Sequence, residues 1–181
     1  AELSPVSWSK FSAVHPFSPK SQTRGFLSVI SDLEEWISEI VGLDAVSFQP
    51  NAGSQGELAG LLSIRSYFYD KNDLDRDICL IPKSAHGTNP ASAVMAGFKV
   101  VSIECDGEGN IDIDNLSLKI KTFGSKIGAL MITYPSTHGV FEERIRDICD
   151  LVHGTGAFVY LDGANLNAQV GLCKPGNYGV D

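Results

Sequence analysis

Apolar residues recur at helical spacing between residues 25 and 41, and Gly42 directly follows them as a stop signal. The apolar positions of this segment are Phe26, Val29, Ile30, Leu33, Trp36, Ile37, Ile40 and Val41. The pattern predicts an amphipathic helix. The preceding stretch, residues 1–24, is rich in serine and proline, which indicates an irregular N-terminal arm that lies on a surface.

Beyond this helix, short apolar runs alternate with segments of helical pattern. The runs that predict strands are 45–49, 78–81, 99–104, 129–134 and 158–161. The segments that predict helices are 55–69, 90–96, 114–123 and 142–153. The strand runs are continuously apolar, which is typical of a parallel sheet covered by helices on both faces. We therefore expect an α/β domain over residues 25–181, doubly wound around a mostly parallel sheet.

Length, charge and cysteine content narrow the classes of function. A chain of 181 residues fits one domain but is short for a complete α/β enzyme, so we expect a fragment. The net charge is -8 and lysine and arginine are scattered, which argues against nucleic acid or an anionic membrane as a partner. No apolar run approaches the length of a membrane span. The four cysteines form no CxxC pair, which favours reduced thiols in an intracellular protein.

Four polar clusters each follow one of the predicted strands. They are 51–57 (NAGSQGE), 84–91 (SAHGTNPA), 135–143 (PSTHGVFEE) and 162–169 (DGANLNAQ). The carboxyl ends of the strands of an open parallel sheet line one crevice, so groups that are distant in sequence converge there. The pattern therefore predicts an active site at this edge of the sheet.

The first cluster joins a strand to a helix through Gly53 and Gly56, with Ser54 and Gln55 between them. Free backbone N–H groups at the start of a helix hold a phosphate, and small residues let it approach closely. The alternative is a glycine-containing turn with Ser54 as the N-cap. The sequence matches neither the Walker A pattern nor GxGxxG, so a nucleoside triphosphate or a dinucleotide is not indicated.

The same segment also imitates the nucleophile elbow of α/β-hydrolases, with Ser54 as the nucleophile. That fold has an acid and then a histidine downstream of the serine. Here His86, His138 and His153 all precede the best-placed carboxylate, Asp162. Chain order therefore counts against a serine hydrolase, which remains a third hypothesis.

His86 lies in a loop bounded by glycine and proline, where an imidazole can stack on a flat ring or transfer a proton. The alternative is a surface histidine, with Thr88 and Asn89 as caps of the following helix. The group formed by Ser136, Thr137 and His138 is also compatible with a simple turn.

Asp162 ends an apolar strand and precedes Gly163 and Ala164, which leave room for a ligand. A partly desolvated acid at this position needs a cationic or N–H partner. A protonated ring nitrogen, Mg²⁺ or a helix cap would serve, although no HExxH or Cys/His spacing supports a metal. A phosphate cradle, a ring-stacking histidine and an aspartate for a pyridinium nitrogen together describe a pocket for pyridoxal 5'-phosphate.

At these residues the chain resembles the glycine decarboxylase P-protein family, the pyridoxal-phosphate subunit of the glycine cleavage system. The stretches that carry the resemblance are 15–17 (HPF), 48–60 (FQPNAGSQGELAG), 81–93 (IPKSAHGTNPASA), 131–143 (MITYPSTHGVFEE) and 159–171 (VYLDGANLNAQVG). Leu58 departs from the family pattern, which usually has an aromatic residue there.

The resemblance implies the large domain of a fold-type-I pyridoxal-phosphate-dependent transferase, incomplete here and located in the C-terminal half of the family protein. It implies that the cofactor phosphate lies at Gly53, Ser54 and Gln55. It further implies that His86 stacks on the ring, that Asp162 pairs with the pyridinium nitrogen and that Thr137 and Ala164 line the pocket. His86 and Asp162 are thus the expected catalytic residues, and no metal is expected.

The resemblance also implies the reaction. The family releases the carboxyl carbon of glycine as CO₂ and passes the aminomethyl group to the lipoyl arm of a carrier protein. Asp162 would keep the ring nitrogen protonated, so that the cofactor acts as an electron sink. A dimer is expected for the full-length protein. The expected location is the mitochondrial matrix for a eukaryotic source and the cytoplasm for a bacterial one.

The lysine that forms the Schiff base in the family follows the position of Asp181, in a His-Lys pair. None of Lys83, Lys99, Lys126 and Lys174 stands in that motif. We therefore expect the parent protein to be an enzyme and the isolated chain to be inactive. The alternative from another class is a truncated, non-catalytic module that binds phosphate ligands.

Overall fold

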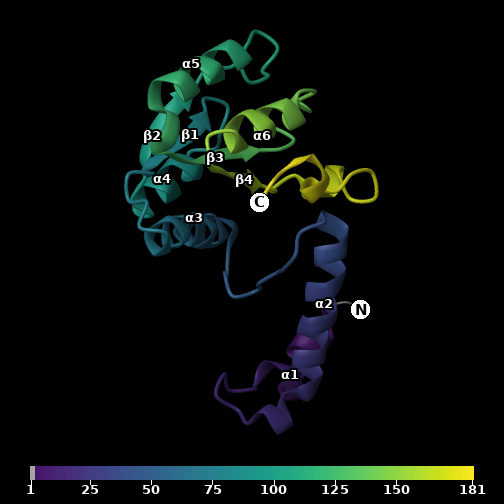
Figure 1. The fold of residues 1–181 in the computed structure, drawn as a ribbon. Helices are drawn as coiled ribbons and strands as arrows, with labels where there is room; N and C mark the ends of the chain where they lie inside the picture. Colours follow the sequence, from purple (N-terminus) through teal and green to yellow (C-terminus); the bar gives the residue numbers. More distant parts are fainter. Residues whose placement is uncertain (1–2) are drawn as a thin grey trace.

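A computed structural model describes residues 3–181 and contains a four-stranded, fully parallel sheet (Figure 1). Its strands are β1 (Ile78–Pro82), β2 (Lys99–Ile103), β3 (Ile127–Thr133) and β4 (Phe158–Asp162), in the spatial order β2-β1-β3-β4. The predicted parallel sheet is confirmed. Each of these four strands lies within two residues of the run that predicted it.

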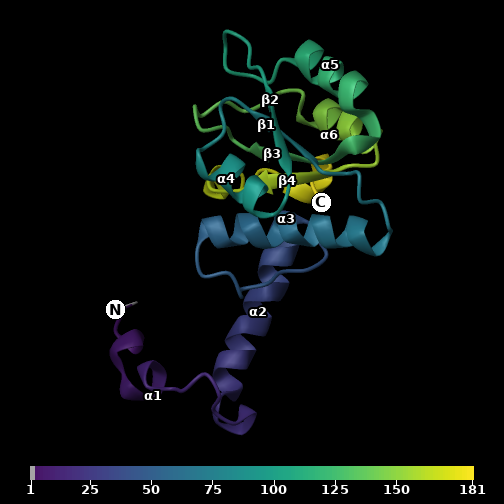
Figure 2. The same cartoon turned by 90° about the vertical axis from the view of Figure 1, so that its left-hand side faces the viewer.

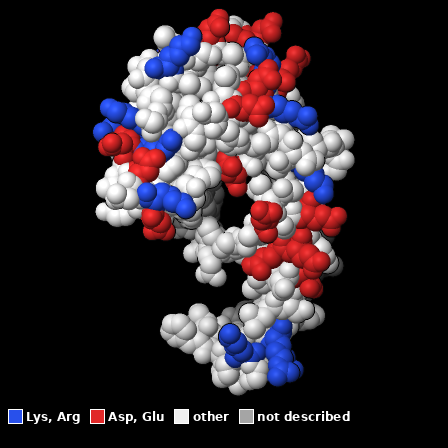
Figure 3. Space-filling model, in the orientation of Figure 1, with Lys and Arg blue, Asp and Glu red and all other residues white. Residues whose placement is uncertain are grey.

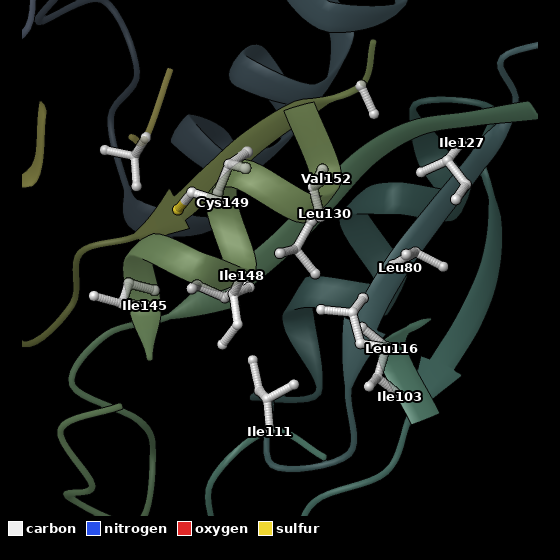
Figure 4. Packing of buried hydrophobic residues seen from close by; sticks show 14 of the residues in the cluster. Leu80, Ile103, Ile111, Leu116, Ile127, Leu130, Ile145, Ile148, Cys149 and Val152 are labelled. Atoms are coloured by element: carbon white, nitrogen blue, oxygen red, sulfur yellow. The ribbon is translucent and has the colours of Figure 1, made fainter. Parts of the chain in front are cut away.

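Helices cover both faces of this sheet. They are α3 (Gly53–Asp70) and α4 (Thr88–Met95) on one face, and α5 (Ile113–Phe123) and α6 (Ile145–His153) on the other. Neighbouring residues of one strand point to opposite faces. Leu80 therefore packs with Leu116 and Ile148 in the core under α5 and α6 (Figure 4), while Cys79 packs with Leu61 under α3 and α4. Two buried faces explain why the strand runs are apolar without alternation.

The strand order places a topological switch point between β1 and β3. From β1 the chain passes through α4 to β2 on one side, and after α5 it returns past β1 to β3 and β4. In open parallel sheets the crevice at such a switch point, beyond the carboxyl ends of the strands, is where ligands bind. Thr133 and Asp162 lie opposite each other at this edge.

The predicted amphipathic helix is confirmed as α2 (Arg24–Val41). Figures 1 and 2 show that it projects away from the sheet, with the short helix α1 (Ser9–Ser12) near its far end. Two 3-10 turns, η1 (Pro5–Ser7) and η2 (Lys20–Gln22), flank α1. Acidic side chains gather along α2 close to the rest of the molecule, and basic ones at its far end (Figure 3).

The strand predicted over residues 45–49 is wrong. This segment is irregular, and the Phe48 side chain is 42% exposed. The apolar pattern is present, but a strand also needs a neighbour for its backbone groups, and within residues 3–181 the sheet contains only the four strands above.

Helix α6 begins at Ile145, three residues after the predicted start. The physical reason is Glu142, whose buried Oε2 accepts a hydrogen bond from the Ile111 backbone N–H at 2.7 Å and so belongs to a tertiary contact.

Within residues 3–181, no helix combines the length and the apolar character that crossing a membrane requires.

Candidate active site

Asp162 is the centre of a hydrogen-bonded group at the carboxyl edge of the sheet, here named the Asp162 cluster. Its Oδ2 accepts a hydrogen bond from Nδ2 of Asn89, which is fully buried, at 3.0 Å. The Thr133 hydroxyl lies 3.3 Å from Asn89 Oδ1 and 3.5 Å from Asp162 Oδ2. Oδ1 accepts the Ala164 backbone N–H at 3.1 Å. The carboxylate is therefore held in one orientation by β3, α4 and the turn after β4.

The electrostatic surroundings of Asp162 favour a cation. Tyr160, two residues earlier in β4, has a pKa raised to about 12, first by burial and then by the negative charges of Asp162 and Glu57. The same two carboxylates that disfavour a phenolate would attract a positively charged group.

Glu57 is the centre of a second group, the Glu57 cluster. Glu57 lies within α3 and is only 6% exposed, although it is an acidic residue. Oε1 accepts the Thr88 hydroxyl and Oε2 accepts the Ser92 hydroxyl, each at 2.9 Å. Thr88 and Ser92 are one turn apart on the same face of α4, which lets one carboxylate bind both. Because Asn89 follows Thr88, the first turn of α4 joins the two clusters.

His86 is attached to the Glu57 cluster through Thr88. Its Nδ1 lies 3.0 Å from Thr88 Oγ1 and 3.2 Å from the Thr88 backbone N. His86 is exposed, and within the described residues only its Nδ1 is held by hydrogen bonds. This placement is compatible with the predicted stacking on a ligand ring.

The start of α3 has the features of an anion site. The N-cap is Ala52 in an extended conformation, and no side chain caps the helix. The backbone N–H groups of Gly53 and Ser54 have no hydrogen-bond partner within residues 3–181, as expected for a first helical turn. An added Cβ at Gly53 or Gly56 would meet nothing within 4 Å, so the space beside this turn is open.

The alternative that Ser54 is the N-cap is wrong, because Ser54 lies inside the first turn. The Gln55 side chain instead reaches back, and its Oε1 accepts the Asn51 backbone N–H at 2.9 Å. Within the described residues, no hydrogen bond joins Ser54 to a histidine, so the geometry does not assemble the pair that a serine hydrolase needs.

The remaining predicted site residues differ in how closely they are tied to these clusters. Ala164 contacts Asp162 directly through its backbone, and residues 53–55 begin the helix turn before Glu57. Thr137 is exposed in the turn after β3, and within residues 3–181 its side chain makes no hydrogen bond. In that turn Ser136 is the organising residue, since its Oγ accepts the N–H groups of His138 and Val140 at 3.2 Å.

Sequence reasoning missed the residues that hold the candidate site together. The sequence pattern marks Asn89 only as a helix cap, Glu57 only as the end of a glycine-rich cluster, and Thr133 only as part of a strand. One signal was available for Glu57. It precedes the apolar Leu61 by four residues, so both lie on the same face of a helix, and that face is expected to be buried.

These groups fit a ligand that carries a phosphate, a flat ring and a cationic ring nitrogen. The start of α3 offers N–H donors, His86 offers an imidazole face and Asp162 offers an oriented carboxylate. Within residues 3–181, no group of three or more His, Cys, Asp and Glu residues is arranged to hold a metal ion.

Comparison with known proteins gives sequence matches over the whole chain. Glycine dehydrogenase (decarboxylating) from a strain of Prochlorococcus marinus is 64% identical over 181 residues, which are 100% of this chain and 19% of that protein. The protein of the same name from a strain of Synechocystis is 58% identical over the same 181 residues, 18% of its length. No protein-family model matches the chain.

Solved structures resemble the fold. A glycine decarboxylase (P-protein) in inhibitor-bound form aligns with a TM-score of 0.78 and 21% identity, over 98% of this chain and 38% of that chain. The glutamate decarboxylase domain of a Vibrio parahaemolyticus protein aligns with a TM-score of 0.69 and 19% identity, over 83% and 37%. Oryza sativa TDC, solved with PLP and tryptamine, aligns with a TM-score of 0.63 and 13% identity, over 79% and 36%.

The fold is that of the large domain of fold-type-I pyridoxal-phosphate-dependent enzymes, as predicted. The chain spans about a fifth of the length of the curated relatives it matches. The sequence match covers every residue of the chain, so this segment is similar along its whole length to a stretch of the glycine dehydrogenase (decarboxylating) proteins.

Proposed function

We propose that this segment provides the ring-nitrogen and phosphate contacts of a pyridoxal 5'-phosphate site in a glycine-decarboxylating enzyme. The observation that carries the proposal is the Asp162 carboxylate, which Asn89, Thr133 and the Ala164 N–H hold at the switch point of the sheet. The names of the relatives support the reaction, and a structural neighbour solved with PLP supports the cofactor.

Each part of the crevice would have one task. The first turn of α3 would bind the phosphate through the N–H groups of Gly53 and Ser54, and the imidazole of His86 would cover one face of the ring. Asp162 would accept a hydrogen bond from the ring nitrogen and keep its proton in place. When bound, the cofactor supplies an electron sink for the negative charge left on glycine when CO₂ departs.

The anchoring lysine is proposed to come from outside this segment. Lys83 is paired with Glu104 at 2.6 Å, and Lys99 is paired with Asp77 at 2.6 Å. Lys126 directly precedes β3, at the edge of the sheet opposite to the crevice. These positions do not favour Lys83, Lys99 or Lys126 as the residue that anchors the cofactor.

The partners follow from the proposed reaction. Glycine would be the substrate, and the aminomethyl group would pass to the lipoyl arm of a carrier protein. A dimer is proposed for the longer protein. The two curated relatives described above are from cyanobacteria, which supports a bacterial source and hence the cytoplasm as the location.

Binding of pyridoxal 5'-phosphate to the purified chain tests the proposal, with equilibrium dialysis as the readout. A charge-assisted hydrogen bond contributes about 1.5–3 kcal/mol, so Asp162→Asn should weaken binding roughly tenfold or more. Asp147→Asn is the matched control, because Asp147 forms an exposed pair with Arg144 on α6 and should leave binding unchanged. Equal binding by Asp162→Asn and the unchanged chain would refute the proposed site. If that equal binding is also saturable, it would favour the non-catalytic module that binds phosphate ligands.

A further inference from the structure

Nδ1 of His86 faces both a donor and an acceptor of the same residue. The Thr88 backbone N–H points at Nδ1 with an N···N distance of 3.2 Å, and Thr88 Oγ1 lies 3.0 Å from it. A neutral imidazole carries its proton on only one nitrogen. The Thr88 N–H can donate only to a bare Nδ1, whereas Oγ1 can accept only from a protonated one, so the two contacts favour opposite tautomers and the stronger of them decides.

The Thr88 hydroxyl has a single proton, which it shares in a hydrogen bond with the Glu57 carboxylate. Oγ1 donates to Glu57 Oε1 at 2.9 Å. Glu57 as a residue is 6% exposed, so hydroxyl groups replace water as donors to its carboxylate, and the other oxygen accepts a hydrogen bond from Ser92 at 2.9 Å. While the Thr88 proton points toward Glu57, Oγ1 presents only lone pairs to His86.

We propose that Glu57 is a positioning residue for His86, which acts through the Thr88 hydroxyl and selects the form of the ring protonated at Nδ1. The chain of contacts runs from His86 Nδ1–H to Thr88 Oγ1 and from the Thr88 hydroxyl to Glu57. The inference deepens the proposed function and rests on it for its purpose. In a neutral ring of this form, Nε2 carries the free lone pair and can accept a hydrogen bond from a bound ligand.

This arrangement also explains why an acidic side chain is buried within α3. A carboxylate at a buried position is costly unless strong donors compensate it. The two hydroxyl groups of α4 compensate Glu57, and only one of them touches His86. Ser92 thus provides a matched control: it donates to the same carboxylate, and within the described residues it forms no hydrogen bond with the imidazole.

The test is the tautomer of the neutral His86 ring, measured from the ¹⁵N chemical shifts of the imidazole over a pH titration that identifies the neutral form. The signal is assigned by its loss in His86→Asn. In the unchanged chain the proton should be on Nδ1. Thr88→Val leaves only the backbone N–H, which requires a bare Nδ1, so the proton should move to Nε2.

Three further variants distinguish the role of the Thr88 hydroxyl, which connects His86 to Glu57, from general effects on folding. Thr88→Ser keeps the hydroxyl and should retain the Nδ1 proton. Ser92→Ala should also retain it. Glu57→Gln keeps the shape but removes the charge, and it should shift the tautomer ratio toward Nε2 by about tenfold, since hydrogen bonds to charged groups are roughly twice as strong as neutral ones. Circular dichroism verifies that each variant is folded.

A proton on Nε2 in the unchanged chain, or an equal shift in Ser92→Ala and Thr88→Val, would overturn the inference. The measurement needs no cofactor. If the tautomers behave as expected while the chain binds no pyridoxal 5'-phosphate, the proposed function fails and the positioning of His86 by Glu57 stands.

Discussion

Helices α2 and α3 have the same length, 18 residues, but they differ in how they are packed. α2 has the clearer separation of apolar and polar positions, yet Val41 is its only buried residue within the described chain. α3 has a much weaker pattern and buries Glu57, Leu61 and Phe68. Amphipathic spacing thus predicts that a helix forms, whereas contact with the sheet decides which of its side chains are buried.

The weaker pattern of α3 has a physical cause in its two tasks. Leu61 packs in the core shared with Cys79 and Met131. One turn earlier, Glu57 points to the hydroxyl groups of α4. A helix that serves both a core and a polar site cannot have a purely apolar buried face, so its hydrophobic pattern is diluted.

The largest expected effect is on Leu61. Leu61→Ala empties space in a fully buried position and should lower the free energy of unfolding by about 2–5 kcal/mol. The matched change in α2, Leu33→Ala, affects a side chain that is 37% exposed and should cost less than about 1 kcal/mol. Urea unfolding followed by circular dichroism measures both. Similar losses in the two variants would contradict the comparison.

A smaller effect is expected where α3 approaches β4. A Cβ added at Gly60 would clash with the Tyr160 ring, so Gly60→Ala should destabilise the chain by about 1–3 kcal/mol. Gly56→Ala, in the same helix, meets nothing within 4 Å and should stabilise the chain by about 0.5–1 kcal/mol. Thermal unfolding of both variants is the measurement, and destabilisation by both would mean that backbone effects, rather than the contact with Tyr160, dominate.

The smallest effect is a pH dependence on the α3 side of the sheet. Burial raises the pKa of Cys79 from 9.0 to about 12. In the unfolded chain this thiol loses its proton first, so the folded state binds more protons between these values and stability falls as pH rises from 9.0 to about 12. Cys79→Ala should reduce this slope in unfolding experiments, while Cys173→Ala, at an exposed position, should not. An unchanged slope in Cys79→Ala would argue that the thiol is already ionised when folded.

The sequence predicted the features of the fold that depend on local pattern. The helix predicted over 25–41 is present as α2, and the predicted strands 78–81, 99–104, 129–134 and 158–161 are present as β1 to β4. In each case the local apolar pattern was sufficient. The strand over 45–49 was wrong because pairing depends on a partner that a local pattern does not contain. The start of α6 shifted because Glu142 bonds to Ile111, a residue 31 positions away.

The same distinction, between local pattern and contacts with distant residues, applies to the candidate site. Asp162 and His86 were predicted because their positions after strands have a meaning in any parallel sheet. Asn89 and Glu57 were not, since each becomes part of the site only through a hydrogen bond to a distant residue: Asn89 to Asp162 and Glu57 to Thr88. The ligand contacts of Asp162, His86, Thr137 and the other predicted site residues stay predictions.

The central claim is that Asp162 holds the proton of a pyridine-type ring nitrogen. The most direct measurement is the ¹⁵N chemical shift of pyridoxal 5'-phosphate that is labelled at its ring nitrogen and bound to the chain. The account predicts a protonated nitrogen in the unchanged chain and a loss of that proton in Asp162→Asn. An unprotonated nitrogen in the unchanged chain, or the same shift in both, would contradict it.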